Sequence, residues 1–151
     1  MSLARQLLAT CMGMYRVTAT GLSPEITHFH QSDPPLMMRD ASDVKPPIDL
    51  DMNPDAAWRK DFDIHANDYH NLLRPETVES LFYMWRITGE QRYRDWGWEM
   101  FESFVQYAQP ANGAGFSSLA HVNQIPPPFK DNMESFWLVS SPLDVYADRP
   151  C

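Results

Sequence analysis

The sequence predicts an all-α protein built from helical hairpins and long loops. Residues 3–20, 75–88 and 91–108 place apolar side chains at intervals of three and four, the period of an amphipathic helix. A Thr88-Gly89-Glu90 break separates the last two segments, so we expect a short turn between two antiparallel helices. Residues 27–67 are rich in proline and aspartate, which interrupt regular elements, and we expect mostly loop there.

Composition restricts the partners that the chain can have. At 151 residues and 44% hydrophobic residues, it is long enough for one modest core. A net charge of -8 repels phosphate backbones, so we expect no nucleic-acid partner. No run of eighteen apolar residues is present, which predicts no membrane-spanning segment, and the first residues lack the pattern of a signal peptide.

The first expected helix, residues 3–20, is predicted to end at Gly21, because glycine suits the position after a helix. A turn follows in which Pro24 prevents helical continuation and Glu25 is placed on a loop. By composition alone, Glu25 is a solvated loop carboxylate. Residues 26–29 favour a short extended segment.

Histidines are spaced in a way that invites a zinc hypothesis. His28 and His30 alternate, and His65 and His70 are five residues apart. No cysteine or spaced carboxylate in the sequence completes a tetrahedral ligand set, so the pattern favours surface histidines over a zinc site.

Two carboxylates lie just inside the start of the second expected helix. Pro75 suits the first helical position, because it has no amide hydrogen to lose and a φ already near the helical value. Glu76 and Glu79 follow in the first turn, where the helix dipole favours negative charge by about 0.3–1 kcal/mol each. Such ionised carboxylates are ordinary helix chemistry, and they are also fit to accept a proton from water or to face a cation.

The aromatic residues of the segment 91–108 recur at helical spacing and indicate a core face. After a glycine-containing loop, Asp131 and Glu134 have the spacing of a capping box, which predicts a helix that begins at residue 131. Pro142 would end that helix after barely two turns.

The run His70-Asn71-Leu72-Leu73-Arg74-Pro75-Glu76-Thr77-Val78-Glu79-Ser80-Leu81-Phe82-Tyr83, continued by Thr88-Gly89 and Asp95-Trp96-Gly97-Trp98-Glu99, resembles the signature of class I α-1,2-mannosidases, glycoside hydrolase family 47. The resemblance implies part of an (α/α)7 barrel, an incomplete toroid. It covers residues 3–138, a partial catalytic domain, and leaves 139–151 as a divergent tail.

The resemblance also implies roles for particular residues. The family consists of calcium-dependent inverting enzymes that trim α-1,2-linked mannose from N-linked glycans. Glu76 would be the general base, and Glu79 would hold a water molecule in the calcium shell. Substrate-binding positions would be Arg74, Pro75, Glu25 and Phe136, the last as an apolar platform under mannose.

Other features of the family have no counterpart in the chain, which implies a fragment that is inactive alone. The general acid would lie upstream and the calcium-binding threonine downstream. Glu76 and Glu79 cannot replace the acid–base pair, because residues three apart on a helix point the same way. The family partner of Cys11 is also upstream, although free thiols or a pairing with Cys151 stay open.

The implied partner is a high-mannose N-glycan, and the implied location is the lumen of the endoplasmic reticulum or Golgi, or secretion. An alternative from another class is a non-catalytic, glycan-binding quality-control protein of the mannosidase-like branch. A third is an incomplete gene model with a read-through tail.

Overall fold

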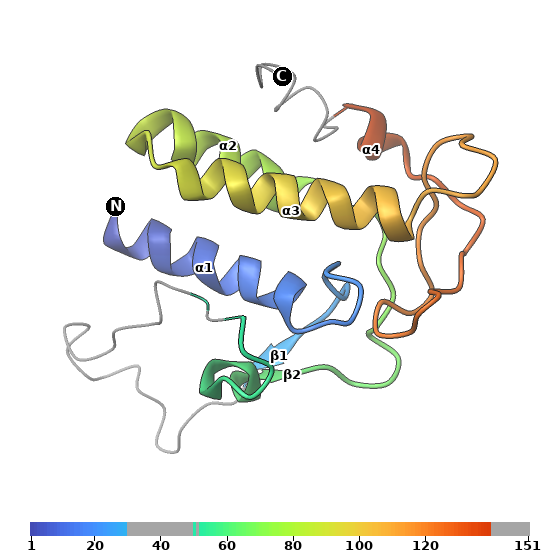
Figure 1. Ribbon diagram of the computed structural model, residues 1–151, viewed down its shortest axis with the longest axis horizontal. Helices are drawn as coiled ribbons and strands as arrows, with labels where there is room; N and C mark the ends of the chain where they lie inside the picture. Colours follow the sequence, from blue (N-terminus) through green and yellow to red (C-terminus); the bar gives the residue numbers. More distant parts are fainter. Residues whose placement is uncertain (30–49, 51, 140–151) are drawn as a thin grey trace.

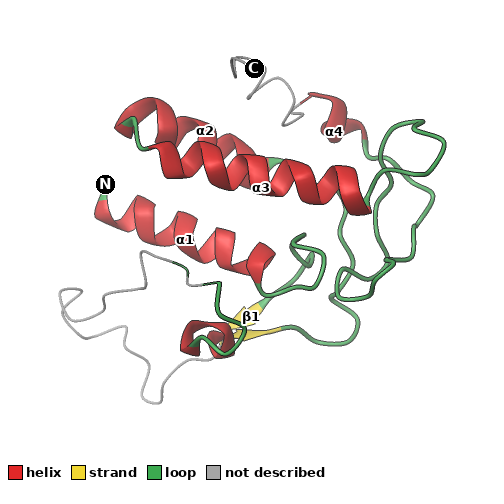
Figure 2. Ribbon diagram, viewed as in Figure 1, coloured by secondary structure: helices red, strands yellow, loops and turns green. Residues whose placement is uncertain are grey.

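The computed structural model describes residues 1–29, 50 and 52–139, and three long helices dominate it (Figures 1 and 2). The expectations for His30, for most of the proline-rich loop, and for the tail with Pro142 and Cys151 lie outside these residues. No helix of the described part is long and apolar enough to cross a bilayer. The elements in chain order are α1 (Ser2–Arg16), β1 (His28–Phe29), η2 (Ala57–Asp61), β2 (Phe62–Asp63), α2 (Glu76–Thr88), α3 (Gln91–Tyr107) and α4 (Ser135–Val139).

Helices α2 and α3 form the predicted hairpin, and α1 packs against α2 (Figure 1). The hairpin turn is as expected, because α2 ends at Gly89 in the left-handed conformation with φ 68°. Apolar side chains at helical spacing on all three helices form the first core cluster, together with a leucine from the loop and a tryptophan from η2. The cluster consists of Leu8, Ala9, Met12, Tyr15, Leu50, Trp58, Val78, Leu81, Met84, Tyr93, Trp96 and Met100.

A second core cluster lies at the C-terminal end of α3 and packs the loops against it. Trp137 of α4 is buried, with its ring 4.7 Å from that of Phe104 and 4.9 Å from that of Phe116. This contact holds the short α4 against α3. The cluster consists of Leu22, Leu73, Phe104, Ala108, Leu119, Val122 and Trp137.

The two strands form a small antiparallel sheet, in which His28 pairs with Asp63 and Phe29 with Phe62. The extended segment expected at residues 26–29 is therefore present in its second half. Phe62 reaches α1 at Gly13, where an added Cβ would lie 2.5 Å from the ring. The close approach of sheet and helix requires glycine at that position.

The predicted end of the first helix is wrong, because α1 stops at Arg16 rather than near residue 20. The hydroxyl of Thr18 lies 3.0 Å from the carbonyl oxygen of Tyr15 and 2.8 Å from that of Leu22. These side-chain contacts stabilise a turn after Arg16 instead of a further turn of helix. Gly21, with φ 70°, belongs to that later turn and does not end the helix.

The predicted capping box is also wrong. Asp131 has φ 51°, whereas an N-cap residue requires an extended backbone, and α4 begins at Ser135. The neighbours of Asp131 pair with another loop instead, since Lys130 N donates to Ser118 O at 2.8 Å. The Glu134 carboxylate accepts a hydrogen bond from Asn132 Nδ2 at 2.7 Å.

Candidate active site

The chain makes a sharp turn immediately before α2. Leu73 is buried and has φ 63°, a left-handed conformation that is uncommon for a residue with a branched side chain. Asn71 holds this turn: its Oδ1 accepts from Leu73 N at 2.9 Å, and its Nδ2 donates to Ser23 O at 2.8 Å. Backbone strain of this kind persists only where the surroundings enforce it. Here it directs Arg74 toward the loop that carries Glu25.

Arg74 is the centre of the candidate site. Its Nε donates to Oε1 of Glu25, and its guanidinium lies 5.7 Å from the ring centroid of Phe136, within range of a cation–π contact. The hydrogen bond to Glu25 is the largest cause that raises the pKa of Arg74, and the charges of Glu76 and Glu134 add to it. Three acidic residues and one aromatic residue, from three segments of the chain, therefore surround one guanidinium.

Glu25 is held in place by its backbone. Its amide N donates to the carbonyl oxygens of His70, at 2.7 Å, and of Asp68, at 3.2 Å. The Glu25 side chain is 13% exposed, whereas that of Arg74 is 50% exposed. The ion pair is thus anchored on the Glu25 side and open to a ligand on the Arg74 side.

Glu76 and Glu79 occupy the first turn of α2, and both side chains are exposed. Pro75 is the N-cap residue and not the first helical residue, so α2 begins one residue later than predicted. The first helical hydrogen bond runs from Glu79 N to Pro75 O at 3.1 Å. Within the described residues, neither glutamate side chain makes a hydrogen bond or ion pair. Glu76 lies within electrostatic range of both Arg74 and Tyr15.

Tyr15 of α1 lies beneath this helix start and was not predicted as part of the site. Its ring is buried, and burial is the main cause that raises its pKa. Its hydroxyl interacts with the side chains of Thr77 and Ser23, and these interactions oppose that rise. Tyr15 thus links α1, the first turn of α2 and the loop before Glu25. In the sequence, its only signal is a place in an apolar stripe.

Residues 1–141 match the family described as glycosyl hydrolase family 47. The chain belongs to this family. It is 45% identical over 138 residues to the mannosyl-oligosaccharide 1,2-α-mannosidase MNS3 of Arabidopsis thaliana, covering 91% of this chain and 20% of that protein. It is 43% identical over 140 residues to the human endoplasmic reticulum mannosyl-oligosaccharide 1,2-α-mannosidase, covering 91% and 17%. The family-47 chain therefore spans about a fifth of the length of these curated relatives.

A solved structure of another α-1,2-mannosidase has a fold similar to that of this chain. The α-1,2-mannosidase from Trichoderma reesei matches with a TM-score of 0.69 and 26% identity, over 93% of this chain and 26% of that one. The prediction of a helical chain that forms part of an α/α barrel is confirmed by this match. The relatives are named as α-1,2-mannosidases, which are glycosidases.

The structure brings some of the predicted site residues of this family-47 chain together. Arg74 contacts Glu25 and Phe136 directly and lies in the field of Glu76. Glu134, expected to cap a helix, adds its charge to the same group. Glu79 is on the same helical turn as Glu76, but no contact among the described residues connects it to Arg74.

Proposed function

We propose that the chain supplies one side of the active site of a mannosyl-oligosaccharide 1,2-α-mannosidase. The substrate is a high-mannose N-glycan, and the reaction is hydrolysis of an α-1,2-linked mannose with inversion. One observation carries the proposal: in a chain of family 47, Arg74 joins Glu25 to Phe136 beside the exposed carboxylate of Glu76.

Glu76 is the proposed general base. An inverting glycosidase needs an ionised carboxylate that takes a proton from the attacking water, and a protonated carboxyl about 6.5–9.5 Å away across the scissile bond. Glu76 is exposed to solvent in the first turn of α2, where water can reach its carboxylate. Glu79 is three residues further along the same helix and faces the same way. The acid is therefore expected on another hairpin of the barrel.

Arg74, Glu25 and Phe136 are the proposed sugar-binding group. The half-exposed guanidinium and the carboxylate offer a donor and an acceptor for neighbouring hydroxyls. Phe136 adds an apolar surface for the less polar face of the mannose ring. Pro75 is buried and fixes the direction in which Arg74 enters the site, because a residue before proline is restricted to extended conformations.

Calcium is the proposed cofactor, and the donor chemistry in the first turn of α2 fits it. Calcium takes six to eight oxygen ligands, among them carboxylates and waters, and Glu79 offers an exposed carboxylate with no cationic partner among the described residues. We infer that Glu79 would hold a water in the calcium shell. When bound, the ion would orient the sugar hydroxyls and the attacking water.

The proposed location is the secretory pathway, in the endoplasmic reticulum or Golgi lumen, or outside the cell. Several relatives, among them the human and Saccharomyces cerevisiae proteins, are named as endoplasmic reticulum mannosidases.

A chimera tests the proposed function. The matching 140 residues of the human relative would be replaced by this chain, and mannose release would be measured with α-1,2-, α-1,3- and α-1,6-linked substrates. The expected result is calcium-dependent release from the α-1,2-linked substrate. A folded chimera that releases no mannose, or prefers another linkage, would contradict the proposal.

The 151-residue chain alone is expected to show negligible turnover, because Glu76 and Glu79 provide only one side of the acid–base apparatus. Measurable calcium-dependent release of mannose by the purified chain would contradict that expectation. A glycan array with and without a chelator tests the non-catalytic alternative. That alternative would gain support if the chain bound glycans while the chimera stayed inactive.

A further inference from the structure

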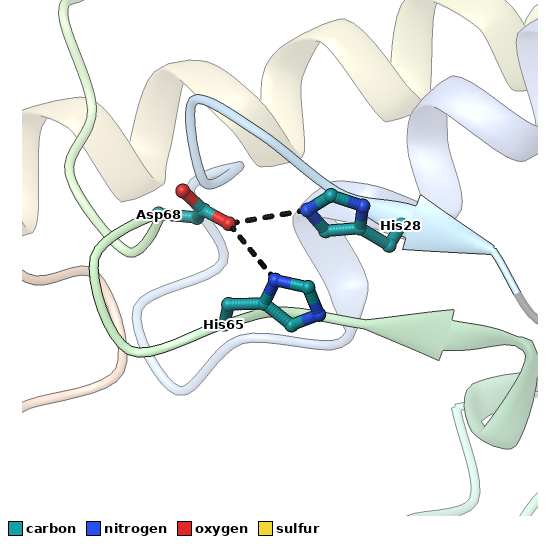
Figure 3. Close-up of side chains that lie close together, drawn as sticks. All are labelled: His28, His65 and Asp68. Atoms are coloured by element: carbon teal, nitrogen blue, oxygen red, sulfur yellow. Dashed lines mark hydrogen bonds and ion pairs between the residues drawn. The ribbon is translucent and has the colours of Figure 1, made fainter.

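Three potential metal ligands meet where the small sheet joins the loop that follows it. His28 Nε2 lies 3.3 Å from Asp68 Oδ2, and His65 Nδ1 lies 3.8 Å from the same oxygen. The three ligand atoms are all within 4.8 Å of one another. Figure 3 shows His28 on β1 and His65 on the segment after β2, with one nitrogen of each imidazole ring directed toward the Asp68 carboxylate.

The backbone positions these side chains independently of any ion. Antiparallel pairing of β1 with β2 places His28 opposite Asp63, and His65 follows two residues later. Asp68 N donates to His65 O at 2.9 Å, which closes the turn that contains both ligands. Asp68 O in turn accepts from Glu25 N at 3.2 Å. The sheet, the turn and the Glu25 loop are therefore connected by main-chain hydrogen bonds.

The separations suit a small ion with tetrahedral geometry. Nitrogen and oxygen ligands lie about 2.0–2.2 Å from zinc, which puts two ligands of a tetrahedral site about 3.4 Å apart. The observed separations of 3.3 and 3.8 Å lie on either side of that value. His28 and His65 are 47% and 57% exposed, which leaves their side chains room to turn toward an ion.

A second carboxylate orients one of the histidines. Asp63 Oδ2 lies 3.3 Å from His65 Nε2, the ring nitrogen that faces away from Asp68. A proton held on Nε2 by this carboxylate leaves the lone pair of Nδ1 free for a metal, which is the usual carboxylate–histidine–metal arrangement. The two rings stack in this structure, with centroids 4.0 Å apart and planes inclined by 17°, so one ring has to turn before both lone pairs can meet a single ion.

We propose that His28, His65 and Asp68 bind a divalent transition-metal ion of the zinc type. Two imidazoles and one carboxylate suit zinc, nickel or copper, whereas calcium and magnesium prefer all-oxygen sets. The site is separate from the proposed calcium position at Glu79. Bound metal would fasten β1 to the turn after β2, and through Asp68 O it would steady the loop that presents Glu25 to Arg74.

Zinc binding by the untagged 151-residue chain tests the proposal, measured by competition with a chromophoric zinc indicator. One zinc ion per chain is expected to bind. His65→Ala should weaken binding by about 100-fold or more, and Asp63→Asn, which removes only the orienting charge, by about 10–100-fold. His121→Ala is the matched control, because His121 stacks on Tyr69 and is not one of the three ligands, so the affinity should be unchanged.

Thermal melting provides a second readout that does not depend on the indicator. With free zinc at 100 times its Kd, the midpoint should rise by about 5–10 °C in the wild type and not in His65→Ala, and calcium should give no such rise. Equal zinc affinity of the wild type, His65→Ala and His121→Ala, or no binding at micromolar zinc, would overturn the proposal. Neither outcome would decide the chimera test, which measures release of mannose and not binding of zinc.

Discussion

Replacement of Tyr15 by phenylalanine tests how the start of α2 is held in place. Phenylalanine fills the same buried space, so the change removes only the hydroxyl, which interacts with the side chains of Thr77 and Ser23. A buried group left without its partner costs about 1–3 kcal/mol. Thr77 and Ser23 are only partly buried, and water can replace some of what they lose. We therefore expect a loss of about 1–2 kcal/mol, or about 2–8 °C in melting temperature.

The pH dependence of the free energy of unfolding provides a second test of the Tyr15 hydroxyl. The ordinary pKa of tyrosine is 10.0, and burial raises that of Tyr15 in the folded state. As pH rises above 10, the unfolded chain releases this proton while the folded chain keeps it, so wild-type stability falls. The variant lacks the group, and its stability deficit relative to the wild type should shrink between about pH 9 and 11.

Urea unfolding of the wild type, Tyr15→Phe and Tyr83→Phe at several pH values measures both effects. Tyr83 is on α2 and 56% exposed, so its variant should match the wild type at neutral pH. If Tyr15→Phe equals the wild type at pH 7 and the difference stays constant to pH 11, the reasoning about this hydroxyl is refuted.

Three further predictions concern the core, a turn and a thiol. Trp137→Ala should destabilise the chain by about 3–5 kcal/mol, because it empties the space between Phe104 and Phe116; an unfolding curve unchanged from the wild type would contradict this. Gly89→Ala should cost about 1–2 kcal/mol in the same assay, since it puts a Cβ on a left-handed residue, and a more stable variant would refute the assignment. Cys11 is partly buried, which raises its pKa, so iodoacetamide should label it more slowly than after unfolding in urea; equal rates would contradict that.

The sequence was a good guide where a local rule determines the backbone. Pro75 and Gly89 mark the limits of α2 to within one residue, because one has a fixed φ and the other tolerates the left-handed conformation. The apolar stripes predicted which helix faces are buried. The proximity of Glu25 and Arg74 could be anticipated only from the family resemblance, since 49 residues separate them in the sequence.

The sequence-based predictions failed where contacts with a distant segment determine the backbone conformation. Asp131 and Glu134 have the spacing of a capping box, but pairing of Lys130 with Ser118 sets the backbone there. The carboxylate that completes the histidine cluster, Asp68, lies 40 residues after His28, and only the pairing of β1 with β2 reveals it. Neither effect leaves a trace in local spacing.

The most direct test of the central claim is Glu76→Gln in the chimera with the human relative. Glutamine keeps the size and the helix position but cannot accept the proton from water. The rate of mannose release should fall by about 10²–10⁴-fold, whereas Glu102→Gln, an exposed glutamate on α3, should keep the full rate. A Glu76→Gln chimera as active as its Glu102→Gln counterpart would contradict the assignment of Glu76 as the general base.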